Sequence, residues 1–329
     1  MGVISYFQAI VIGLLQGVTE LFPVSSLGHS VLLPALLGWS GILKDQAAQE
    51  SPFLAFLVGL HVATALALLW FFREDWARIV AGLLRSLRTR QIETADERLG
   101  WLLVVATIPA GLVGVIFEHE LRTLFAKPLA AAIFLTINGG ILLAGERLRR
   151  ASGIGDLERR LDPRRLEAIA RGERQHERLV DAEDGMALLQ PPRSIPATPR
   201  RARALSTLSF PEATLIGAAQ ILAFFAGISR SGVTMVTGLS RGLDHEDAAR
   251  FAFLLATPII LAAGVYKLPD FLGPNGNGVR GQILVGSLVA AGAAYVSVRF
   301  LIRWFETRTL TPFAIYCLVA GILCIIRFS

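Results

Sequence analysis

The sequence predicts an all-α membrane protein that crosses the bilayer several times. Hydrophobic residues make up 53% of the 329-residue chain, charged residues make up 18%, and the mean hydropathy is +0.55. An ordinary soluble domain carries about a quarter charged residues, so this composition excludes a disordered chain, a fibrous protein and an ordinary cytosolic enzyme. Several apolar segments also approach the roughly 20 residues that a spanning helix needs.

Eight apolar segments account for this composition. Six of them have the length of simple spans, and they are 53–72, 101–117, 128–145, 249–267, 281–302 and 311–327. The other two, 3–38 and 207–240, contain polar and turn-forming residues near their middle. Non-helical backbone at membrane depth is tolerated only inside the protein or beside a wet cavity. We therefore predict that these two segments are re-entrant helix–break–helix hairpins.

The Arg residues predict the orientation. The 73–100 loop carries six Arg, and short loops rich in positive charge face the cytoplasm. This places the 73–100 loop and the 146–206 and 303–310 segments inside. Both termini and the 118–127 and 268–280 loops are then outside. The apolar start of the chain has no basic region or cleavage site, so we expect no removable signal peptide.

Residues 146–206 are the most charged part of the chain, with 14 Arg and 10 acidic residues. Acids nearly balance the Arg and no aromatic residues interleave with them, which argues against a nucleic-acid partner. We predict a charged cytoplasmic connector, and contact with anionic membrane lipid is the alternative. The connector divides the chain into a first membrane repeat, 1–145, and a second membrane repeat, 207–329.

A shift of 204 positions aligns the two broken segments. Ser5, Ala9, Ile12, Gly13, Gln16, Ser25 and Gly28 then match Ser209, Ala213, Ile216, Gly217, Gln220, Ser229 and Gly232. Each broken segment precedes three spans, and three is an odd number, so the second copy should be inverted relative to the first. Such inverted-topology repeats place their site near the bilayer midplane, where the broken elements meet.

The first break contains candidate catalytic residues. Gln16 and Glu20 are four residues apart, so they share one face of a helix. A Glu inside an apolar segment costs about 2.5–3.5 kcal/mol on insertion scales and marks a functional site, unless it lies at a helix end near water. Glu20 or His29 could act as a base that activates the hydroxyl of Ser25 or Ser26. Helix capping is the alternative role of such serines.

In the second break, Arg230 is the residue that most strongly indicates a functional site. A guanidinium keeps its charge in a protein, so at membrane depth it needs an anion. That anion is either Glu20, as a structural partner, or a phosphate bound by the guanidinium fork. Ser229, Ser231 and Thr234 suit an oxyanion cradle at a helix N-terminus. The set predicts phosphoryl transfer on an amphiphilic phosphate ester or pyrophosphate, and Glu20 and a pyrophosphate could share a divalent ion such as Mg²⁺.

At these motifs the chain resembles the bacterial undecaprenyl pyrophosphate phosphatase family, the membrane enzymes associated with bacitracin resistance. The resemblance rests on residues 16–29 and 227–234, and residues 251–258 and 312–316 also look like family segments. There are departures from the family pattern. Ala226 stands in place of the usual Pro, Gln16 is the uncharged option at its position, and the connector is longer than the family usually has.

The resemblance implies hydrolysis of the C55 isoprenoid pyrophosphate to its monophosphate, which recycles the lipid carrier for cell-wall synthesis. It also implies a requirement for a divalent cation, Mg²⁺ or Ca²⁺. The enzyme would lie in the bacterial cytoplasmic membrane with its active site open to the outer face. A flippase or transporter of a polyprenyl phosphate is the alternative function. The chain could also form a homodimer, which the sequence leaves open.

The family's functional residues carry over to matching positions of this chain. By similarity, the catalytic residues are Glu20, Ser26, His29 and Arg230; the phosphate-binding residues are Ser25, Ser229, Arg230, Ser231 and Thr234; Gln16 is a supporting residue; and Glu20 is also the candidate metal ligand. We expect Ser26 to be the nucleophile, with Glu20 or His29 as its base. The competing assignment makes His29 the nucleophile, and the sequence does not separate the two.

Overall fold

A computed structural model of the chain describes residues 4–39, 41–42, 52–125, 127–151, 205–267 and 278–329. Over these ranges the chain is helical, and they contain no β-strand. Six helices are long and apolar enough to cross a membrane: α4 (Pro52–Phe71), α6 (Ala95–Phe125), α7 (Pro128–Ala151), α12 (His245–Tyr266), α14 (Arg280–Phe305) and α15 (Thr311–Phe328). The prediction of an all-α protein with six candidate spans is confirmed.

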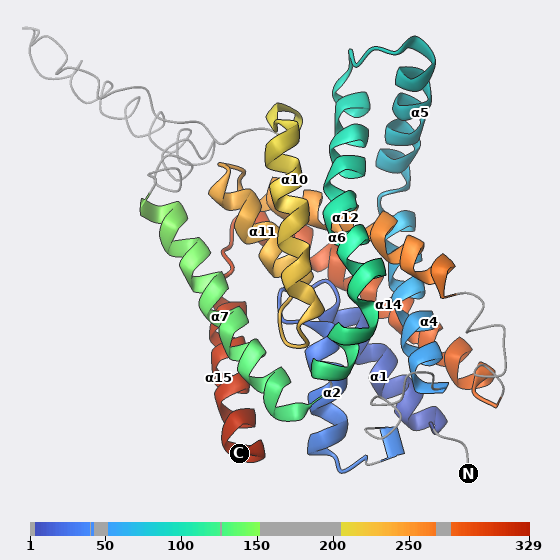
Figure 1. Cartoon of the computed structure of the whole chain (residues 1–329), viewed down its shortest axis with the longest axis vertical. Coiled ribbons are helices and arrows are strands. Elements are labelled where there is room, and N and C mark those ends of the chain that lie inside the picture. Colours follow the sequence, from blue (N-terminus) through green and yellow to red (C-terminus); the bar gives the residue numbers. More distant parts are fainter. Residues whose placement is uncertain (1–3, 40, 43–51, 126, 152–204, 268–277) are drawn as a thin grey trace, which may run out of the picture.

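The segment 73–100 differs from the loop that the sequence analysis predicts. Most of it is helical, because α5 (Arg73–Thr89) follows α4 directly and α6 begins at Ala95. Ile79 and Ser86 of α5 are buried against α6, and the Trp101 indole donates a 2.7 Å hydrogen bond to the Ser86 hydroxyl. A narrow apolar stripe on an otherwise charged helix does not show in a hydropathy average. The α5–α6 hairpin projects at the end of the molecule remote from both termini (Figure 1).

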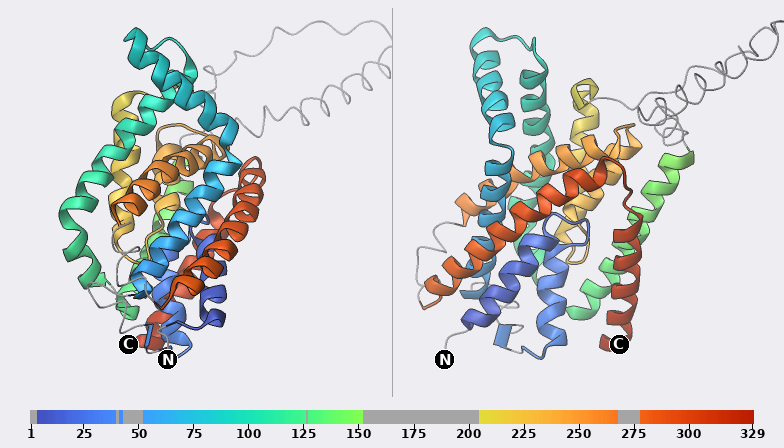
Figure 2. Two further views of the ribbon diagram at one scale, coloured as in Figure 1. Left: turned by 90° about the vertical axis from the view of Figure 1, so that its right-hand side faces the viewer. Right: turned by 180° about the vertical axis from the view of Figure 1, so that it is seen from behind.

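The two broken segments approach the centre of the molecule from opposite ends. The first consists of α1 (Tyr6–Thr19) and α2 (Ser26–Leu36), and both helices lie on the side of the two termini. The second consists of α10 (Phe210–Ala219), the short helix η2 (Gln220–Phe224) and α11 (Arg230–Ser240), which lie on the other side. The two breaks meet between them (Figure 2).

The broken segments have the same caps at equivalent positions. Ser5 is the N-cap of α1 and Ser209 is the N-cap of α10, each in a capping box with the residue three positions later. In the breaks, the Ser25 hydroxyl accepts a hydrogen bond from Gly28 N and the Ser229 hydroxyl accepts one from Gly232 N, both at 3.2 Å. A side-chain oxygen that satisfies an otherwise unpaired N–H is what allows each helix to start there.

The first helix of each broken segment crosses a span of the other half at close range. α1 packs on α14, where a Cβ on Gly13 would lie 2.5 Å from the Gly286 carbonyl oxygen. α10 packs on α6, where a Cβ on Gly217 would lie 1.9 Å from the Ala106 carbonyl oxygen. Glycine is therefore required at both crossings. α7 and α15 also pack along each other, so the two halves are interleaved.

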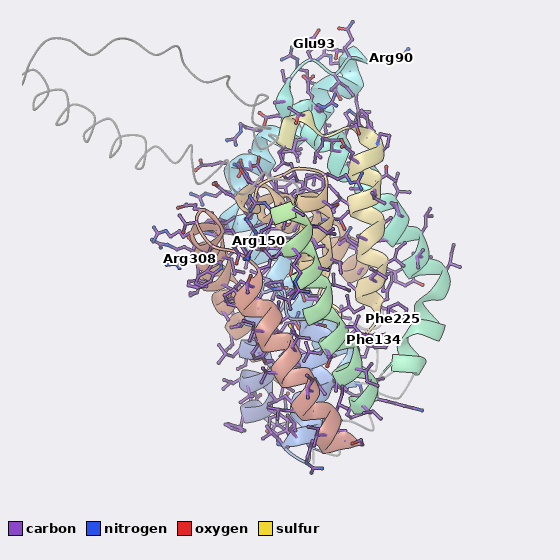
Figure 3. The ribbon with its side chains drawn as sticks, turned by 90° about the vertical axis from the view of Figure 1, so that its left-hand side faces the viewer. Arg90, Glu93, Phe134, Arg150, Phe225 and Arg308 are labelled. Carbon is purple, nitrogen blue, oxygen red and sulfur yellow. The ribbon has the colours of Figure 1, made fainter. Side chains whose placement is uncertain are left out.

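Three Arg residues from different parts of the chain lie toward one end of the molecule. Arg90, Arg150 and Arg308 all lie nearer that end than Phe134 and Phe225, whose rings stack at 5.0 Å (Figure 3). The predicted connector begins within this region, but its residues 152–204 lie outside the described part of the chain, as do residues 268–277 of the last predicted outside loop. The division into two repeats stays a prediction.

Candidate active site

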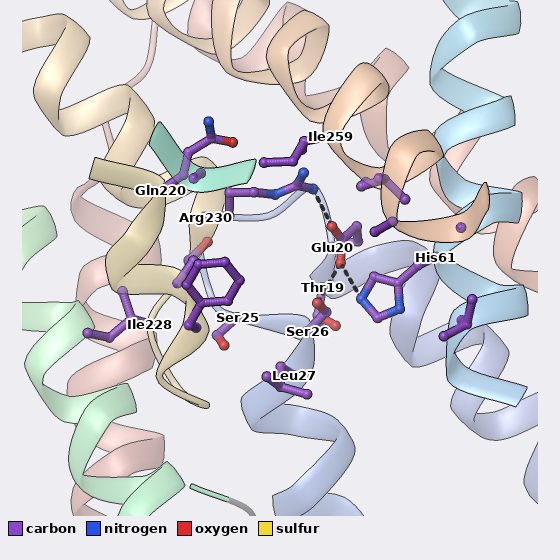
Figure 4. A pocket seen from close by; sticks show the side chains of 18 of the residues that line it. Thr19, Glu20, Ser25, Ser26, Leu27, His61, Gln220, Ile228, Arg230 and Ile259 are labelled. Carbon is purple, nitrogen blue, oxygen red and sulfur yellow. Dashed lines mark hydrogen bonds and ion pairs between the residues drawn. The ribbon is translucent and has the colours of Figure 1, made fainter. Parts of the chain in front are cut away.

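A cavity of about 350 Å³ lies beside the point where the two breaks meet (Figure 4). Polar residues from both breaks line one part of it, namely Thr19, Glu20, Ser25, Ser26, Ser229 and Arg230. Apolar residues line most of the remainder, among them Val58 and Val62 of α4, Phe224 of η2, and Ile259, Ile260 and Ala263 of α12. A few convergent polar groups in a mostly apolar cavity are typical of a small-molecule site, and this division suits an amphiphilic ligand.

Glu20 is the centre of the polar cluster. It caps the C-terminus of α1, and its side chain is only 6% exposed. Its Oε1 forms an ion pair with the Arg230 guanidinium. Its Oε2 accepts hydrogen bonds from Gln16 Nε2 at 3.0 Å and from Ser26 Oγ at 2.5 Å. The structure thus brings three other predicted site residues together around the carboxylate of Glu20.

Ser26 is the first residue of α2 and is half-buried at the cavity. Its hydroxyl proton points to Glu20 Oε2. A carboxylate in this position can take the hydroxyl proton as the oxygen attacks an electrophile. The geometry therefore pairs a candidate nucleophile directly with a candidate base.

Arg230 is the first residue of α11, and its guanidinium spans from the first break to α12. Besides its ion pair with Glu20, Nη1 donates a 3.3 Å hydrogen bond to the Ala256 carbonyl oxygen. The N-terminal ends of α2 and α11 both lie at this cavity. Helix N-termini carry unpaired N–H groups and partial positive charge, so the cluster offers an anion two helix dipoles and a guanidinium.

His61 of α4 belongs to the same cluster, although the sequence analysis did not select it. Its Nε2 lies 3.4 Å from Glu20 Oε2, and its Nδ1 makes a 2.9 Å hydrogen bond with the Leu57 carbonyl oxygen. Its side chain is 31% exposed and lines the cavity. An ionisable side chain within a span was the available signal, but the sequence analysis treats 53–72 as a simple span.

The predicted phosphate-binding hydroxyls bond mainly to the breaks themselves. Ser25 Oγ accepts from Gly227 N at 3.1 Å as well as from Gly28 N. Ser229 Oγ lies 3.0 Å from Ser231 Oγ, and Thr234 Oγ1 donates to the Arg230 carbonyl oxygen at 2.7 Å. Ser25 and Ser229 line the cavity, whereas Ser231 and Thr234 are not among its lining residues. Phosphate binding by these four residues stays a prediction.

His29 lies apart from the cluster. Its Nδ1 makes a 2.7 Å hydrogen bond with the Ser25 carbonyl oxygen, and its Nε2 makes one of the same length with the Tyr316 hydroxyl. The His29 and Tyr316 rings stack at 5.7 Å, and His29 is not among the residues that line the cavity. Both ring nitrogens are therefore engaged away from Glu20. A catalytic role of His29 stays a prediction.

Asn138 of α7 ties the two breaks together, and it too was not selected from the sequence. Its Nδ2 donates to the Pro23 carbonyl oxygen and its Oδ1 accepts from Ser229 N, each at 3.0 Å. Nδ2 also lies 3.3 Å from Cys317 Sγ of α15. Asn138 is fully buried, so its amide replaces water as the partner of backbone groups that the breaks leave unpaired.

The surroundings of Glu20 do not fit a resident metal ion. Each hydrogen bond or ion pair described for its two oxygens comes from an amide, a hydroxyl, a guanidinium or an imidazole. Within the described residues no group of three or more His, Cys, Asp or Glu side chains could hold a metal. The predicted Mg²⁺ or Ca²⁺ requirement is not tested by this arrangement.

Residues 9–323, which include the whole cluster, match the model of the family described as bacitracin resistance protein BacA. The chain belongs to the BacA family. It is 56% identical to undecaprenyl-diphosphatase 2 of Frankia alni, over 99% of this chain and 98% of that protein. It is 55% identical to the undecaprenyl-diphosphatase of Mycolicibacterium paratuberculosis, over 97% and 95% respectively. The resemblance to the undecaprenyl pyrophosphate phosphatase family, identified from the two motifs, is confirmed.

Proposed function

We propose that this chain hydrolyses undecaprenyl diphosphate to undecaprenyl phosphate and inorganic phosphate, which recycles the lipid carrier for peptidoglycan synthesis and confers bacitracin resistance. The observation that carries the proposal is the cluster of Glu20, Ser26 and Arg230 beside a mostly apolar cavity. The names of the relatives support the same reaction. They favour hydrolysis over the alternative of lipid transport.

In the proposed reaction Arg230 binds the terminal phosphate, whose charge takes the place of the Glu20 carboxylate at the guanidinium. Ser26 Oγ then attacks the terminal phosphorus, and its proton passes to Glu20. The bond between that phosphorus and the bridging oxygen breaks, and undecaprenyl phosphate leaves. Phosphoryl transfer depends mainly on positioning and charge stabilisation, which the guanidinium and the two helix N-termini supply. Water then hydrolyses the phosphoserine.

The apolar part of the cavity would receive the isoprenoid next to the diphosphate. Burying apolar area contributes about 25 cal/mol per Å², so this part of the substrate supplies binding energy without touching the reacting atoms. The polar cluster alone would bind any diphosphate. The apolar wall is therefore the feature that favours a lipid diphosphate over a soluble one.

We further propose that the divalent cation, Mg²⁺ or Ca²⁺, arrives with the diphosphate. Mg²⁺ in proteins usually keeps several waters and binds through substrate phosphates and few carboxylates. Such an ion would neutralise part of the phosphate charge. Glu20 is already surrounded by donors, so the groups that bind the phosphate, attack it and move the proton remain Arg230, Ser26 and Glu20.

We also propose that α1–α2 and α10–α11 are re-entrant hairpins of an inverted repeat in the bacterial cytoplasmic membrane. The matching caps, the opposite directions of approach and the position of Arg90, Arg150 and Arg308 toward one end support this arrangement. The active site then opens to the outer face. Cysteines introduced at Arg90 and Ser329 should react with a membrane-impermeant maleimide from the cytoplasmic and the outer side, respectively. A homodimer stays a prediction.

Release of phosphate by purified protein in detergent tests the reaction. No membrane or gradient exists there, so a transporter would release none. With undecaprenyl diphosphate and Mg²⁺ or Ca²⁺, wild type should release phosphate, and Ser26→Ala should release at most a small fraction of that amount. An inactive wild type would rule out the enzyme.

A further inference from the structure

The proposed reaction contains two proton removals, but among the described residues that line the cavity only Glu20 carries a carboxylate. The first proton leaves Ser26 when its oxygen attacks phosphorus, and Glu20 accepts it. The second leaves the water that later attacks the phosphoserine. Glu20 is then protonated, and its proton is needed on Ser26 Oγ as that oxygen leaves. Gln16, the other side chain that bonds to Glu20 Oε2 from α1, is an amide and takes up no proton.

His61 is placed to accept the second proton. The Leu57 carbonyl oxygen only accepts hydrogen bonds, so the contact at 2.9 Å fixes the hydrogen on Nδ1. In the neutral ring the lone pair is then on Nε2, which lies 3.4 Å from Glu20 Oε2. Once Glu20 has accepted the Ser26 proton, Nε2 no longer faces a charged carboxylate and can accept a proton itself. The His61 side chain is 31% exposed at the cavity, against 6% for Glu20, so water reaches the imidazole more readily than the carboxylate.

The other charged or imidazole groups near the cluster do not meet this need. Arg230 and Lys267 also line the cavity, but a guanidinium and an ammonium have no lone pair to accept a proton. Both ring nitrogens of His29 are bonded to Ser25 and Tyr316. Among the described residues that line the cavity, His61 is the remaining side chain that can act as a base near neutral pH.

We propose that His61 is the general base of the second half of the reaction, a role that rests on the proposed function. Water attacks the phosphorus of phospho-Ser26, and its proton passes to His61 Nε2. The bond between Ser26 Oγ and phosphorus breaks, and Glu20 returns its proton to Ser26. Inorganic phosphate leaves, and His61 releases its proton to solvent. Two bases thus divide the work that one carboxylate cannot do in both steps.

Rapid-quench kinetics of His61→Gln with substrate labelled in the terminal phosphate tests this role. The amide keeps a polar side chain but cannot serve as a base. We expect a burst of undecaprenyl phosphate close to the wild-type rate, followed by turnover reduced by roughly 10²-fold or more, as for loss of a general base. Label should accumulate on Ser26. Thr64→Val, one turn further along α4, removes a buried hydroxyl bonded to the His61 carbonyl oxygen and should change neither phase.

A second variant restores a base from another position. Gln16→Glu placed in the His61→Gln background returns a second carboxylate beside Glu20, and it should recover at least about a tenth of the wild-type turnover. Wild-type turnover by His61→Gln would overturn the proposal, as would equal loss of burst and turnover without label. If His61→Gln does not fold, His61→Asn is tested in the same assay, and the same preserved burst with reduced turnover is expected. A wild type that releases no phosphate would instead overturn the proposed function itself.

Discussion

Glu20 and Arg230 are 210 residues apart in the sequence and form an ion pair that joins the two broken segments. Glu20 caps the C-terminus of α1 and Arg230 begins α11, and their side chains are 6% and 16% exposed. Removing one partner of a buried pair leaves an uncompensated charge and costs about 3–5 kcal/mol. The same two residues therefore affect both the stability of the protein and the chemistry of the site.

Stability and activity can be separated at this pair. Arg230→Met should reduce turnover by about 10²–10³-fold or more, because a preorganised partner of the transition-state charge is lost, and it should lower the melting temperature in detergent. Adding Glu20→Gln removes the unpaired charge, so the double variant should regain thermal stability but no activity. Turnover and the melting temperature are both measured on the purified proteins.

Arg250→Met is the matched control for this prediction. Arg250 pairs with Asp75 at 2.6 Å and its side chain is 41% exposed, and exposed pairs contribute at most about 1 kcal/mol. Its removal should leave phosphate release unchanged. An Arg230→Met variant with activity similar to that of Arg250→Met would contradict the anion-binding role of Arg230.

The chemical stability of a trapped intermediate distinguishes the two candidate nucleophiles. The Ser26 hydroxyl bonds to Glu20, whereas the His29 ring nitrogens bond to Ser25 and Tyr316. We therefore expect labelled phosphate to form an acid-stable ester on Ser26 and no acid-labile phosphohistidine. Ser26→Ala should carry no label, while Tyr316→Phe should still carry it. Acid-labile label that persists in Ser26→Ala and disappears when His29→Ala is added would instead identify His29, whereas loss on addition of His61→Gln would identify His61.

Much of the fold follows from local features that one sequence displays. Long apolar runs predict the spans, and polar residues inside apolar runs predict the two breaks. α5 was missed because its buried stripe, which includes Ile79, lies on a charged helix. The ends of α6 extend beyond the predicted 101–117 because charged residues such as Asp96 and Glu97 continue the helix at its favoured acidic N-terminus.

The candidate site was predictable where a residue type was costly in its place. Glu20 and Arg230 stand out because a charged side chain at membrane depth is costly and therefore indicates a functional site. The same argument, extended to the simple spans, would also have selected His61. The contacts of Asn138 and His29 were not predictable. Asn138 bonds to residues 115 and 91 positions away, and His29 bonds to Tyr316, 287 positions away. Such contacts depend on tertiary packing.

Asn138 should control the position of the two breaks relative to each other. Asn138→Leu keeps the size of the side chain but leaves the buried Ser229 N–H without its partner, which costs about 1–3 kcal/mol. It also leaves the Pro23 carbonyl with only the Cys317 thiol, at 3.8 Å. We expect a lower melting temperature and a fall in kcat larger than any change in KM. Thr136→Val on the same helix removes only a hydroxyl bonded within α7. It should leave the melting temperature and kcat unchanged. Normal kcat in Asn138→Leu would show that the breaks hold their positions without it.

Gly227 should be irreplaceable in the second break. Its φ of +117° lies in a region that favours glycine, and an added Cβ would lie 2.4 Å from the Ala131 carbonyl oxygen and 2.6 Å from Leu135 N. Backbone atoms of α7 cannot move aside as a side chain can, so Gly227→Ala must shift the break, and Arg230 three residues later shifts with it. We expect a loss of about 1–3 kcal/mol in stability and a clear fall in phosphate release.

Gly292 of α14 provides the comparison, because, apart from its own turn of helix, no atom of the described residues lies within 4 Å of a Cβ built there. Gly292→Ala should be neutral or stabilising by up to about 1 kcal/mol through helix propensity, with full activity. Thermal unfolding and phosphate release are measured on both variants side by side. Equal stability and activity in the two would mean that the second break tolerates a side chain at 227, and that the position of Arg230 does not depend on this contact with α7.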